Sequence, residues 1–486
     1  MKRDSIYCGA MLLLLTGCAV GPDYSRPALD LPQTYVAQPE QHYQLQDIQN
    51  NWWTVFHSDE LNALIEQAWR ANPSIASAEA ALRAAQENVY AQQGYFLPTV
   101  QAGYTPQRTK LAGNQGGNSP GLQGNGSVIS TGEATPVIYN FHTAQVTVGY
   151  TPDVFGANRR QVESLEAQRQ AQGLQLEAAY ITLASNIVAA AFQDGLLRQQ
   201  IDLTRHIIAS SQTALELAER QHRAGYISRQ ELATQQGALA QARQLLPPLQ
   251  KQLEQNRDLL RVLAGIRSDQ QVPAFELARF QLPEQLPLTL PSQLVEQRPD
   301  VRAAEALLRS ASADVGVARA ARLPQFAITG TAGGTASQFG QMFWNSGKFF
   351  ELTANVTQTL FDGGTLKHRE KAADQALQGA VATYRSTVAA AFQNVADVLH
   401  AIDSDAAVLA AAQEADTAAG TALELALRQH AHGAVDRMEL IAAEQNKRQA
   451  ELTLAQAKAG QLEDAAALYQ ALGGGWWHRS EGEKYE

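Results

Sequence analysis

The residues with the clearest chemical role lie near the N-terminus, where Leu15-Thr16-Gly17-Cys18 forms a lipobox. Two basic residues and a short apolar run precede it, and the run is far below the roughly 20 residues that a membrane-spanning helix needs. This pattern predicts a lipoprotein signal peptide over residues 1–17, after which Cys18 carries the acyl chains. The alternative is an ordinary signal peptide in which the cysteine is incidental.

Little other chemistry is encoded in the chain. Cys8, the other of the two cysteines, leaves with the signal and Cys18 is blocked by lipid, so thiol catalysis and thiolate metal sites are excluded. The glycine-rich stretch within residues 107–140 lacks the GK[ST] of a phosphate-binding loop. His430 and His432 diverge on a helix because they are two positions apart, which disfavours a metal site. Since no GxSxG, HExxH or Walker pattern occurs, we expect neither an enzyme nor any cofactor beyond the covalent lipid.

The charge and hydropathy of the chain restrict its partners. The 486 residues carry a formal net charge of −10, which argues against nucleic acid. No apolar run of 18 or more residues follows the signal, so a transmembrane helix is not predicted. If the protein crosses a membrane, it must use strands.

The sequence contains an internal tandem duplication. Residues 213–232 and 421–440 are identical at thirteen of twenty positions. Residues 72–86 and 298–312 form a second similar pair, and the pentapeptide AAAFQ occurs at 189–193 and again at 389–393. The order of these landmarks is the same in both halves, so one structural unit of roughly 200 residues is present twice, a period too long for a solenoid array.

Each copy begins with helices and continues with two strands. Helices are predicted from Asp59 to Trp69 and on to Tyr95, and again from Pro291 to Arg322. Apolar and polar residues alternate from Phe141 to Tyr150 and from Phe350 to Thr357, which is typical of strands with one apolar face. Their expected partners are the segments that follow a Leu-Pro pair, Thr99–Thr105 and Gln325–Thr331.

Each copy then forms a long helical hairpin. Long helices are expected from Arg159 to Arg223 and from Lys367 to Ala431. A seam with alternating steps of four and three residues predicts a coiled coil; its members are Leu377, Val381, Tyr384, Val388, Ala391, Val395, Val398 and Ile402. Gly225 and Gly433 should end these helices, and Ser228 and Asp436 should begin the returning ones. Pro247-Pro248 is expected to break or kink the first return.

These elements predict an α+β membrane protein whose subunits share one barrel. Four amphipathic strands cannot close a transmembrane barrel, because the smallest have about eight and an open edge is not tolerated in lipid. The predicted segments are a signal (1–17), an extended arm (18–50), a first repeat (51–270, with a β-hairpin at 98–154 and a helical hairpin at 159–265), an equatorial linker (271–290), a second repeat (291–475, with hairpins at 324–361 and 366–472) and a C-terminal tail (476–486).

The order of several motifs resembles the TolC/OprM outer-membrane factors across nearly the whole mature chain. The motifs are CAVGPDYSRP, WWTVFHSDEL, LPSQLVEQRPDVRAAEALL, FDGG, the paired hairpin tips and LYQALGGGW. The resemblance implies a lipid-anchored homotrimer in the outer membrane of a Gram-negative bacterium, with a twelve-stranded β-barrel and a periplasmic α-barrel. It implies a passive exit duct for small molecules in a tripartite efflux system. A periplasmic adaptor would couple the duct to an inner-membrane pump, most often of the resistance-nodulation-division type.

The resemblance also implies roles for residues at the tips. In that family, acidic residues just after the second tip glycine form a ring at a periplasmic gate. Glu439 matches the first of these positions. Ala442 stands at the second position, where many relatives have aspartate. Glu439 would attract cations, or it faces solvent or pairs with Arg437. Its counterpart Glu231 is expected farther from the axis. Expected adaptor contacts are Arg220, Gln221, His222, Gly225, Arg428, Gln429, His430 and Gly433.

Three other functions stay open on the sequence. The duct could serve type I secretion or heavy-metal efflux, because nothing in the sequence encodes the cargo. A lipid-tethered periplasmic coiled-coil spacer is the third alternative, but a spacer needs no strands with an apolar face.

Overall fold

The computed structural model describes residues 19–29, 32, 34–35, 43–45, 47–111, 137–283 and 285–479. The chain forms two compact units. Unit 1 consists of Met1–Ser25, Ala85–Gln168 and Leu308–Gly379, and unit 2 of Arg26–Ala84, Arg169–Leu307 and Ala380–Glu486. Both units combine segments from the two halves of the duplicated sequence, so the repeat in the sequence is not the unit of packing.

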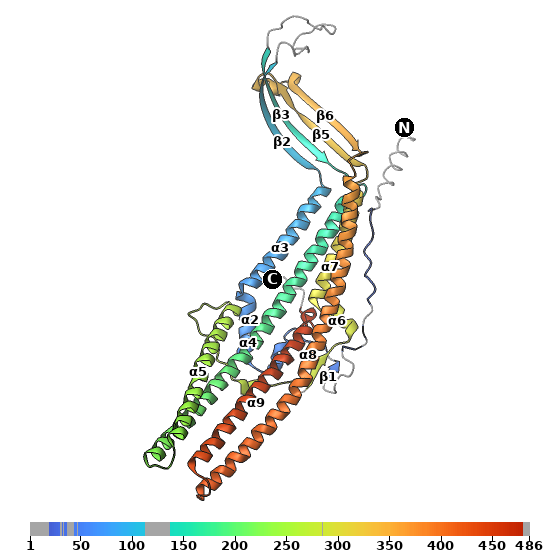
Figure 1. The fold of residues 1–486 in the computed structure, drawn as a ribbon. Coiled ribbons are helices and arrows are strands. Elements are labelled where there is room, and N and C mark those ends of the chain that lie inside the picture. The colour runs from blue at the N-terminus through green and yellow to red at the C-terminus, as the bar shows by residue number, and fades with distance from the viewer. Residues whose placement is uncertain are drawn as a thin grey trace, which may run out of the picture. The chain divides into compact units, whose positions relative to one another are not determined.

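Helices dominate the described residues (Figure 1). The α-helices are α2 (Asp59–Ala71), α3 (Pro73–Gln93), α4 (Ala157–Arg223), α5 (Arg229–Leu263), α6 (Pro291–Gln297), α7 (Pro299–Ala320), α8 (Thr365–Ala431) and α9 (Arg437–Ala471). Short 3-10 helices are η1 (Trp52–Phe56), η2 (Gly94–Phe96), η3 (Leu277–Arg279), η4 (Phe339–Phe343), η5 (Asn345–Gly347) and η6 (Trp476–His478). The helices predicted from the sequence are confirmed to within a few residues.

Two sheets account for the strands. The strands are β1 (Tyr43–Leu45), β2 (Thr99–Leu111), β3 (Val137–Tyr150), β4 (Leu286–Leu288), β5 (Gln325–Ala336) and β6 (Lys348–Thr357). The order β2-β3-β5-β6 makes an antiparallel sheet, and β1 pairs with β4 in parallel. The predicted strand pairs are confirmed. The strands are longer than expected, since residues 107–111 and 137–140 belong to strands rather than to the connection between them. Residues 112–136 of that connection lie outside the described residues.

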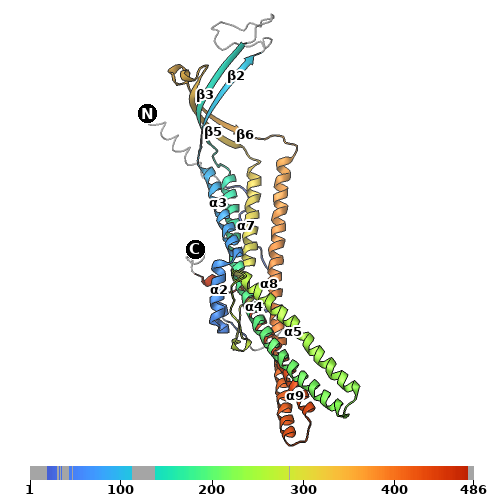
Figure 2. The same cartoon turned by 90° about the vertical axis from the view of Figure 1, so that its left-hand side faces the viewer.

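The two helical hairpins pack side by side in unit 2. Polar side chains bridge the neighbours: Arg243 Nη2 on α5 donates to Gln212 Oε1 on α4 (2.8 Å), Gln445 Nε2 on α9 donates to Ser211 Oγ on α4 (2.9 Å), and Lys447 on α9 pairs with Asp416 on α8 (2.6 Å). The helices therefore lie in the order α5, α4, α9, α8. The turns that end α4 and α8 lie at the same end of this unit (Figure 2).

The coiled-coil seam predicted in α8 is only partly correct. Leu377 and Val381 are half-buried, and Leu399 is buried in the place predicted for Val398. From Tyr384 to Ile402 the buried positions follow steps of 4, 3, 4, 4 and 3. That spacing is the 3.6-residue period of a straight α-helix, so the seam lacks the strict heptad that would impose a left-handed supercoil.

Of the two outcomes predicted for Pro247-Pro248, a break or a kink in the returning helix, the break does not occur. Helix α5 continues through both prolines. Each proline removes one backbone hydrogen bond to the residue four positions earlier. Pro247, Pro248 and the residues they would bond, Arg243 and Gln244, are all exposed, so water can satisfy the freed carbonyl groups.

The core of unit 2 is a chain of aromatic side chains. Trp52 stacks on Tyr469 with ring centroids 5.3 Å apart, and Phe56 meets Phe192 edge to face at 5.0 Å. Phe192 in turn packs against Phe280 at 4.7 Å. Trp52 and Phe56 therefore anchor the N-terminal segment of unit 2 to α9 and α4, respectively.

The residues after α9 form a clasp rather than a free end. Trp476 Nε1 donates to the Gln297 carbonyl (2.6 Å), and His478 Nε2 lies 2.6 Å from Asp47 Oδ2. Arg479 pairs with Glu177 at 3.0 Å, and both side chains are almost completely buried. This closing segment (Trp476 to Arg479) joins α4, α6 and the N-terminal segment of unit 2.

Candidate functional site

The four-stranded sheet of unit 1 has one apolar and one polar face. The register pairs even-numbered with even-numbered residues throughout, so all of them share one face. That face is largely apolar and exposed, with Val100, Tyr104, Val146, Val148, Ile328, Phe350, Leu352 and Val356 among its members. An exposed apolar surface of this extent requires another apolar phase to cover it.

The odd-numbered face of the same sheet is polar. Threonine hydroxyls meet across β3 and β5, with Thr143 Oγ1 3.1 Å from Thr335 Oγ1 and Thr147 Oγ1 3.4 Å from Thr331 Oγ1. Asn355 and Glu351 continue this face on β6. Among the described residues the outer edges of β2 and β6 have no partner strand. The sheet is therefore an open segment that separates an apolar from a polar environment.

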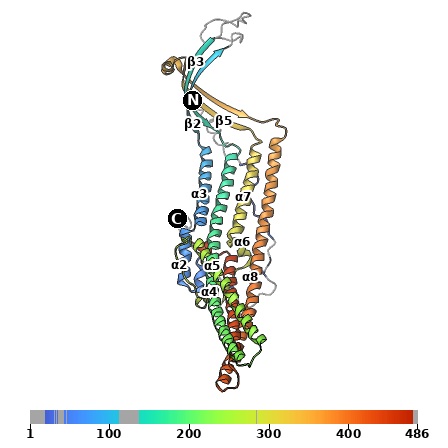
Figure 3. The same cartoon turned by 60° about the vertical axis from the view of Figure 1, so that its left-hand side comes forward.

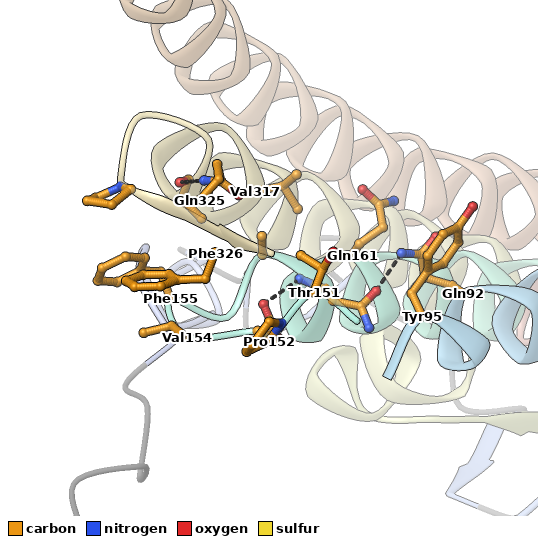
Figure 4. A pocket seen from close by; sticks show the side chains of 15 residues that line it. Gln92, Tyr95, Thr151, Pro152, Val154, Phe155, Gln161, Val317, Gln325 and Phe326 are labelled. Atoms are coloured by element: carbon orange, nitrogen blue, oxygen red, sulfur yellow. Dashed lines mark hydrogen bonds between the residues drawn. The ribbon is translucent and has the colours of Figure 1, made fainter. Parts of the chain in front are cut away.

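The strands are fastened directly to the helices below them. Asp153 accepts hydrogen bonds from the backbone N–H groups of Asn158 (3.0 Å) and Arg159 (2.9 Å), which caps the start of α4. Gln92 Nε2 on α3 donates to Asn158 Oδ1 at 2.6 Å, across a pocket lined by Phe155 and other residues (Figure 4). In this unit the sheet-side ends of α3, α4, α7 and α8 lie side by side (Figure 3).

The N-terminal arm is docked on the same junction. The Val20 N–H donates to the Phe155 carbonyl (3.1 Å), and Asp23 pairs with the buried Arg160 at 2.7 Å. Gly21 has a φ of +115° and approaches Gly316 so closely that a Cβ would collide with its backbone. The sequence predicted an extended arm but missed this docking. Cys18 and the predicted signal lie outside the described residues, immediately before the docked segment.

The hairpin tips are built by the same motif in both copies. Gly225 (φ +80°) and Gly433 (φ +74°) follow the helices in the left-handed conformation. The N–H after each glycine bonds the carbonyl five residues back, Tyr226 to Gln221 and Ala434 to Gln429, both at 2.9 Å. This is a Schellman motif, as the glycines predict.

The repeated histidines have a structural role that the sequence did not reveal. His222 Nδ1 lies 3.0 Å from the Ile227 carbonyl oxygen, and His430 Nδ1 lies 3.1 Å from that of Val435. Each ring thus fastens the turn that follows its own helix.

The two acidic residues after the tips differ in their bonding. Glu231 forms a capping box with Ser228, whose N–H donates to Glu231 Oε2 at 2.6 Å, and these bonds lower the pKa of Glu231. Asp436 accepts the Glu439 N–H at 2.8 Å, but the reciprocal bond is not formed. Glu439 and Ala442 are exposed. Arg437, the alternative partner predicted for Glu439, pairs with Glu444 at 3.8 Å.

The remaining predicted tip residues lie on the surface. Arg220 and Arg428 are exposed, and Arg428 pairs with Glu424 one turn back. Tyr226, which the sequence analysis missed, is 83% exposed directly after the tip glycine.

Two further features to consider in the described part of the chain are a metal site and a membrane-spanning helix. No group of three or more His, Cys, Asp or Glu side chains there is arranged to hold a metal ion. Of the described helices, α4 alone is long and apolar enough to cross a membrane, with a mean hydropathy of 1.2 over its best window. Since 61% of that window is buried inside the structure, its apolar residues serve as protein core.

Comparison with known proteins identifies the family. The model of the outer membrane efflux protein family matches residues 64–266 and 290–474. The pyoverdine export outer membrane protein OpmQ of Pseudomonas putida is 30% identical, covering 87% of this chain and 88% of its own length. The cation efflux system protein CusC of Escherichia coli is 26% identical over 96% of this chain and 97% of its own.

A solved structure has the same fold. The outer-membrane channel OprN aligns with a TM-score of 0.83 at 26% identity, covering 94% of this chain and all of its own. The predicted fold class, an α+β membrane protein that joins a strand segment to long helices, is confirmed by this likeness. The two-faced sheet, the long helical hairpins and these matches agree: the chain belongs to the outer membrane efflux protein family.

Proposed function

We propose that the protein is the outer-membrane exit duct of a tripartite efflux system, through which small molecules pass passively. The observation that carries this proposal is the open sheet with its apolar and polar faces. Such a sheet is suited to separating lipid from an aqueous lumen, but only as part of a closed ring.

Three chains would close that ring as a homotrimer. One chain supplies four strands and leaves the β2 and β6 edges open, so β6 of one subunit can pair with β2 of the next. Three copies give twelve strands, and cyclic symmetry makes all three junctions equivalent. The odd-numbered polar face would line the lumen and the even-numbered face would contact lipid.

The long helices would continue the wall of the duct through the periplasm. Helices α4 and α8 contain 67 residues each, which at 1.5 Å per residue is about 100 Å. In each chain the two hairpins provide two similar staves of this wall. This gives a reason for the internal duplication.

The partners would be a periplasmic adaptor at the tips and an inner-membrane pump of the resistance-nodulation-division type. The repeated tip residues and the exposed Tyr226 support adaptor docking there. Glu439 would face the periplasmic entrance, since its carboxylate is not used in a capping box as that of Glu231 is.

The cargo differs among relatives of similar identity, one named for pyoverdine export and another for cation efflux. A duct that receives cargo from a pump needs no specific site for it. Drug, siderophore and heavy-metal efflux are therefore all compatible with the proposed duct, and no enzyme activity or cofactor is needed.

Covalent lipid on Cys18 would anchor the chain beside the sheet, because the docked arm starts at Ala19. We expect Cys18→Ala to abolish palmitate labelling while the trimer stays in the outer membrane, since the barrel itself is embedded. Loss of the variant from the outer-membrane fraction would contradict a barrel that inserts on its own.

The duct is tested by combining stoichiometry with conductance. Mass photometry of the detergent-extracted protein should give three chains per particle, and the same preparation should open pores in planar bilayers. A monodisperse monomer or dimer that conducts would refute the shared barrel, and a trimer without any conductance would favour a periplasmic spacer.

A further inference from the structure

The connection between β5 and β6 folds over the apolar face of the sheet instead of standing clear of it. Phe339 meets the Tyr104 ring edge to face at 5.7 Å and the His142 ring at 6.4 Å. Met342 is only 1% exposed, whereas Phe343 and Trp344 beside it are 64% and 60% exposed. This connection, residues 337–347, therefore packs on the sheet while presenting aromatic rings outward.

A glycine permits this close approach. A Cβ at Gly334 would collide with the Met342 carbonyl oxygen, so the connection rests directly on the backbone of β5. Gly347 is equally restricted, because a Cβ there would lie 2.6 Å from the Gln341 carbonyl oxygen. The position of the connection over the sheet is thus fixed at both ends.

A groove runs across the sheet beside this connection. One row of cross-strand partners reads Tyr104, Ala144, Gly334 and Lys348, so two small residues lie between two long side chains. Ala102, Val146 and Ala332 continue the floor, and Met342 and Phe343 form a wall. The result is a mostly apolar groove on the face that we assign to lipid.

Lys348 is the one cation among the residues that line the groove. Its Nζ donates to the neutral Asn345 Oδ1 at 3.2 Å, and among the described residues it forms no ion pair with a carboxylate. An uncompensated ammonium on a lipid-facing strand is unfavourable unless it reaches an anionic head group. The groove therefore combines an apolar floor with a positive charge that needs an anion.

We propose that this groove binds one anionic lipid of the outer leaflet, with an acyl chain along the Ala102–Ala144–Ala332 floor and its phosphate at Lys348. This inference rests on the proposed placement of the even-numbered face in lipid. The exposed Phe343 and Trp344 would lie at the level of the head groups, where aromatic residues are favoured. A bound lipid of this kind would fix the depth of the sheet in the membrane.

Native mass spectrometry of the delipidated full-length protein, titrated with phosphatidylglycerol, tests the site. We expect one tightly bound lipid per chain, bound about tenfold more weakly by Lys348→Gln, because the lost contact is a charge-assisted hydrogen bond. Ala144→Phe fills the floor and should weaken binding of both phosphatidylglycerol and zwitterionic phosphatidylcholine. Lys348→Gln should remove only the preference for phosphatidylglycerol.

Lys110→Gln is the matched control, because Lys110 is on the same face of the sheet but outside the groove. Equal lipid retention in the wild type and both groove variants, or an equal loss in Lys110→Gln, would overturn the proposal. Absence of tight binding in the wild type would also overturn it and would indicate that protein covers the groove. Trimer mass and conductance measured on the same samples separate failure of this site from failure of the duct.

Discussion

At the scale of single residues, the two copies of the tip use the same acidic position differently. In the first copy the Glu231 carboxylate accepts a hydrogen bond from the Ser228 N–H, whereas in the second copy Asp436 accepts the Glu439 N–H and the Glu439 carboxylate accepts no bond from Asp436. The helix cap therefore does not use the Glu439 carboxylate, which is available for function.

The first prediction concerns this carboxylate. Glu439→Gln should weaken block of the channel by divalent or trivalent cations, because three carboxylates around the entrance would bind them. The measurement is single-channel conductance with increasing cation on the periplasmic side. Glu231→Gln is the control and should leave the block unchanged; an equal effect of both substitutions would mean that Glu439 has no special place at the entrance.

The second prediction concerns pH and a pair of carboxyl groups between α8 and α9. Burial, followed by the hydrogen bond and the charge of Asp405, raises the pKa of Asp464 to about 6. Burial and the charges of Asp464 and Asp405 also raise the pKa of Glu463. A raised carboxyl pKa contributes stability below the unfolded-state pKa, near 4, and this is lost as the pH rises through about 6.

Asp464→Asn should therefore raise the thermal unfolding temperature at pH 7.5 and change it little at pH 4.5. Asp416→Asn is the comparison, since Asp416 pairs with Lys447 and its loss should destabilise at pH 7.5. An Asp464→Asn protein that is less stable than the wild type at pH 7.5 would contradict the assignment.

At the scale of elements, each hairpin tip combines a rigid turn with side chains that can contact a partner. The Schellman glycine, the histidine ring and the next N-cap fix each turn within a few residues. The polar and aromatic side chains around the turn are then free to meet a partner, because the fold itself uses mainly backbone and histidine atoms.

Gly433→Val tests whether this geometry is needed for coupling. A β-branched residue at a φ of +74° costs about 1–2 kcal/mol, so the turn should distort while the rest of the chain folds. We expect a trimer in the outer membrane that no longer supports efflux in cells. Gly237→Val, which adds the same side chain to an open helical position, is the control. Wild-type efflux from Gly433→Val would show that docking does not depend on this tip.

At the scale of the whole molecule, each compact unit is assembled from segments far apart in the chain. In unit 2 the closing segment lies against residues about 300 positions earlier, since Arg479 pairs with Glu177 and also stacks over the Tyr180 ring at 4.6 Å. Such a unit completes its core only when the C-terminal end of the chain is in place.

Arg479→Ala should accordingly destabilise unit 2. Removing one partner of a buried ion pair takes this partner from the buried Glu177 carboxylate and costs about 3–5 kcal/mol. Chemical denaturation monitored by tryptophan fluorescence measures the loss. Adding Glu177→Gln to this variant should recover part of the stability, because the buried negative charge is then gone. No recovery in the double variant would mean that Arg479 acts through its ring contacts alone.

The duplication, the strand pairs, the long helices and the tip glycines could all be predicted from the sequence, because each depends on local periodicity or on a single backbone conformation. Hydrophobic alternation predicts a strand and its two faces, and a C-cap glycine predicts a turn, without knowledge of distant residues. The sequence did not reveal that α5 continues through Pro247-Pro248, because that depends on whether water reaches the freed carbonyl groups.

Contacts between residues far apart in the chain could be known only from the tertiary structure. The docking of Asp23 on Arg160, the clasp at Arg479 and the pairing of β1 with β4 join segments more than 130 positions apart, and no local pattern encodes such contacts. The groove beside Met342 likewise depends on a connection that folds back over the sheet. In the sequence, the small residues of this groove show only the apolar and polar alternation of an ordinary strand. Their role as the floor of the groove follows from the register that places Ala144 and Gly334 between Tyr104 and Lys348.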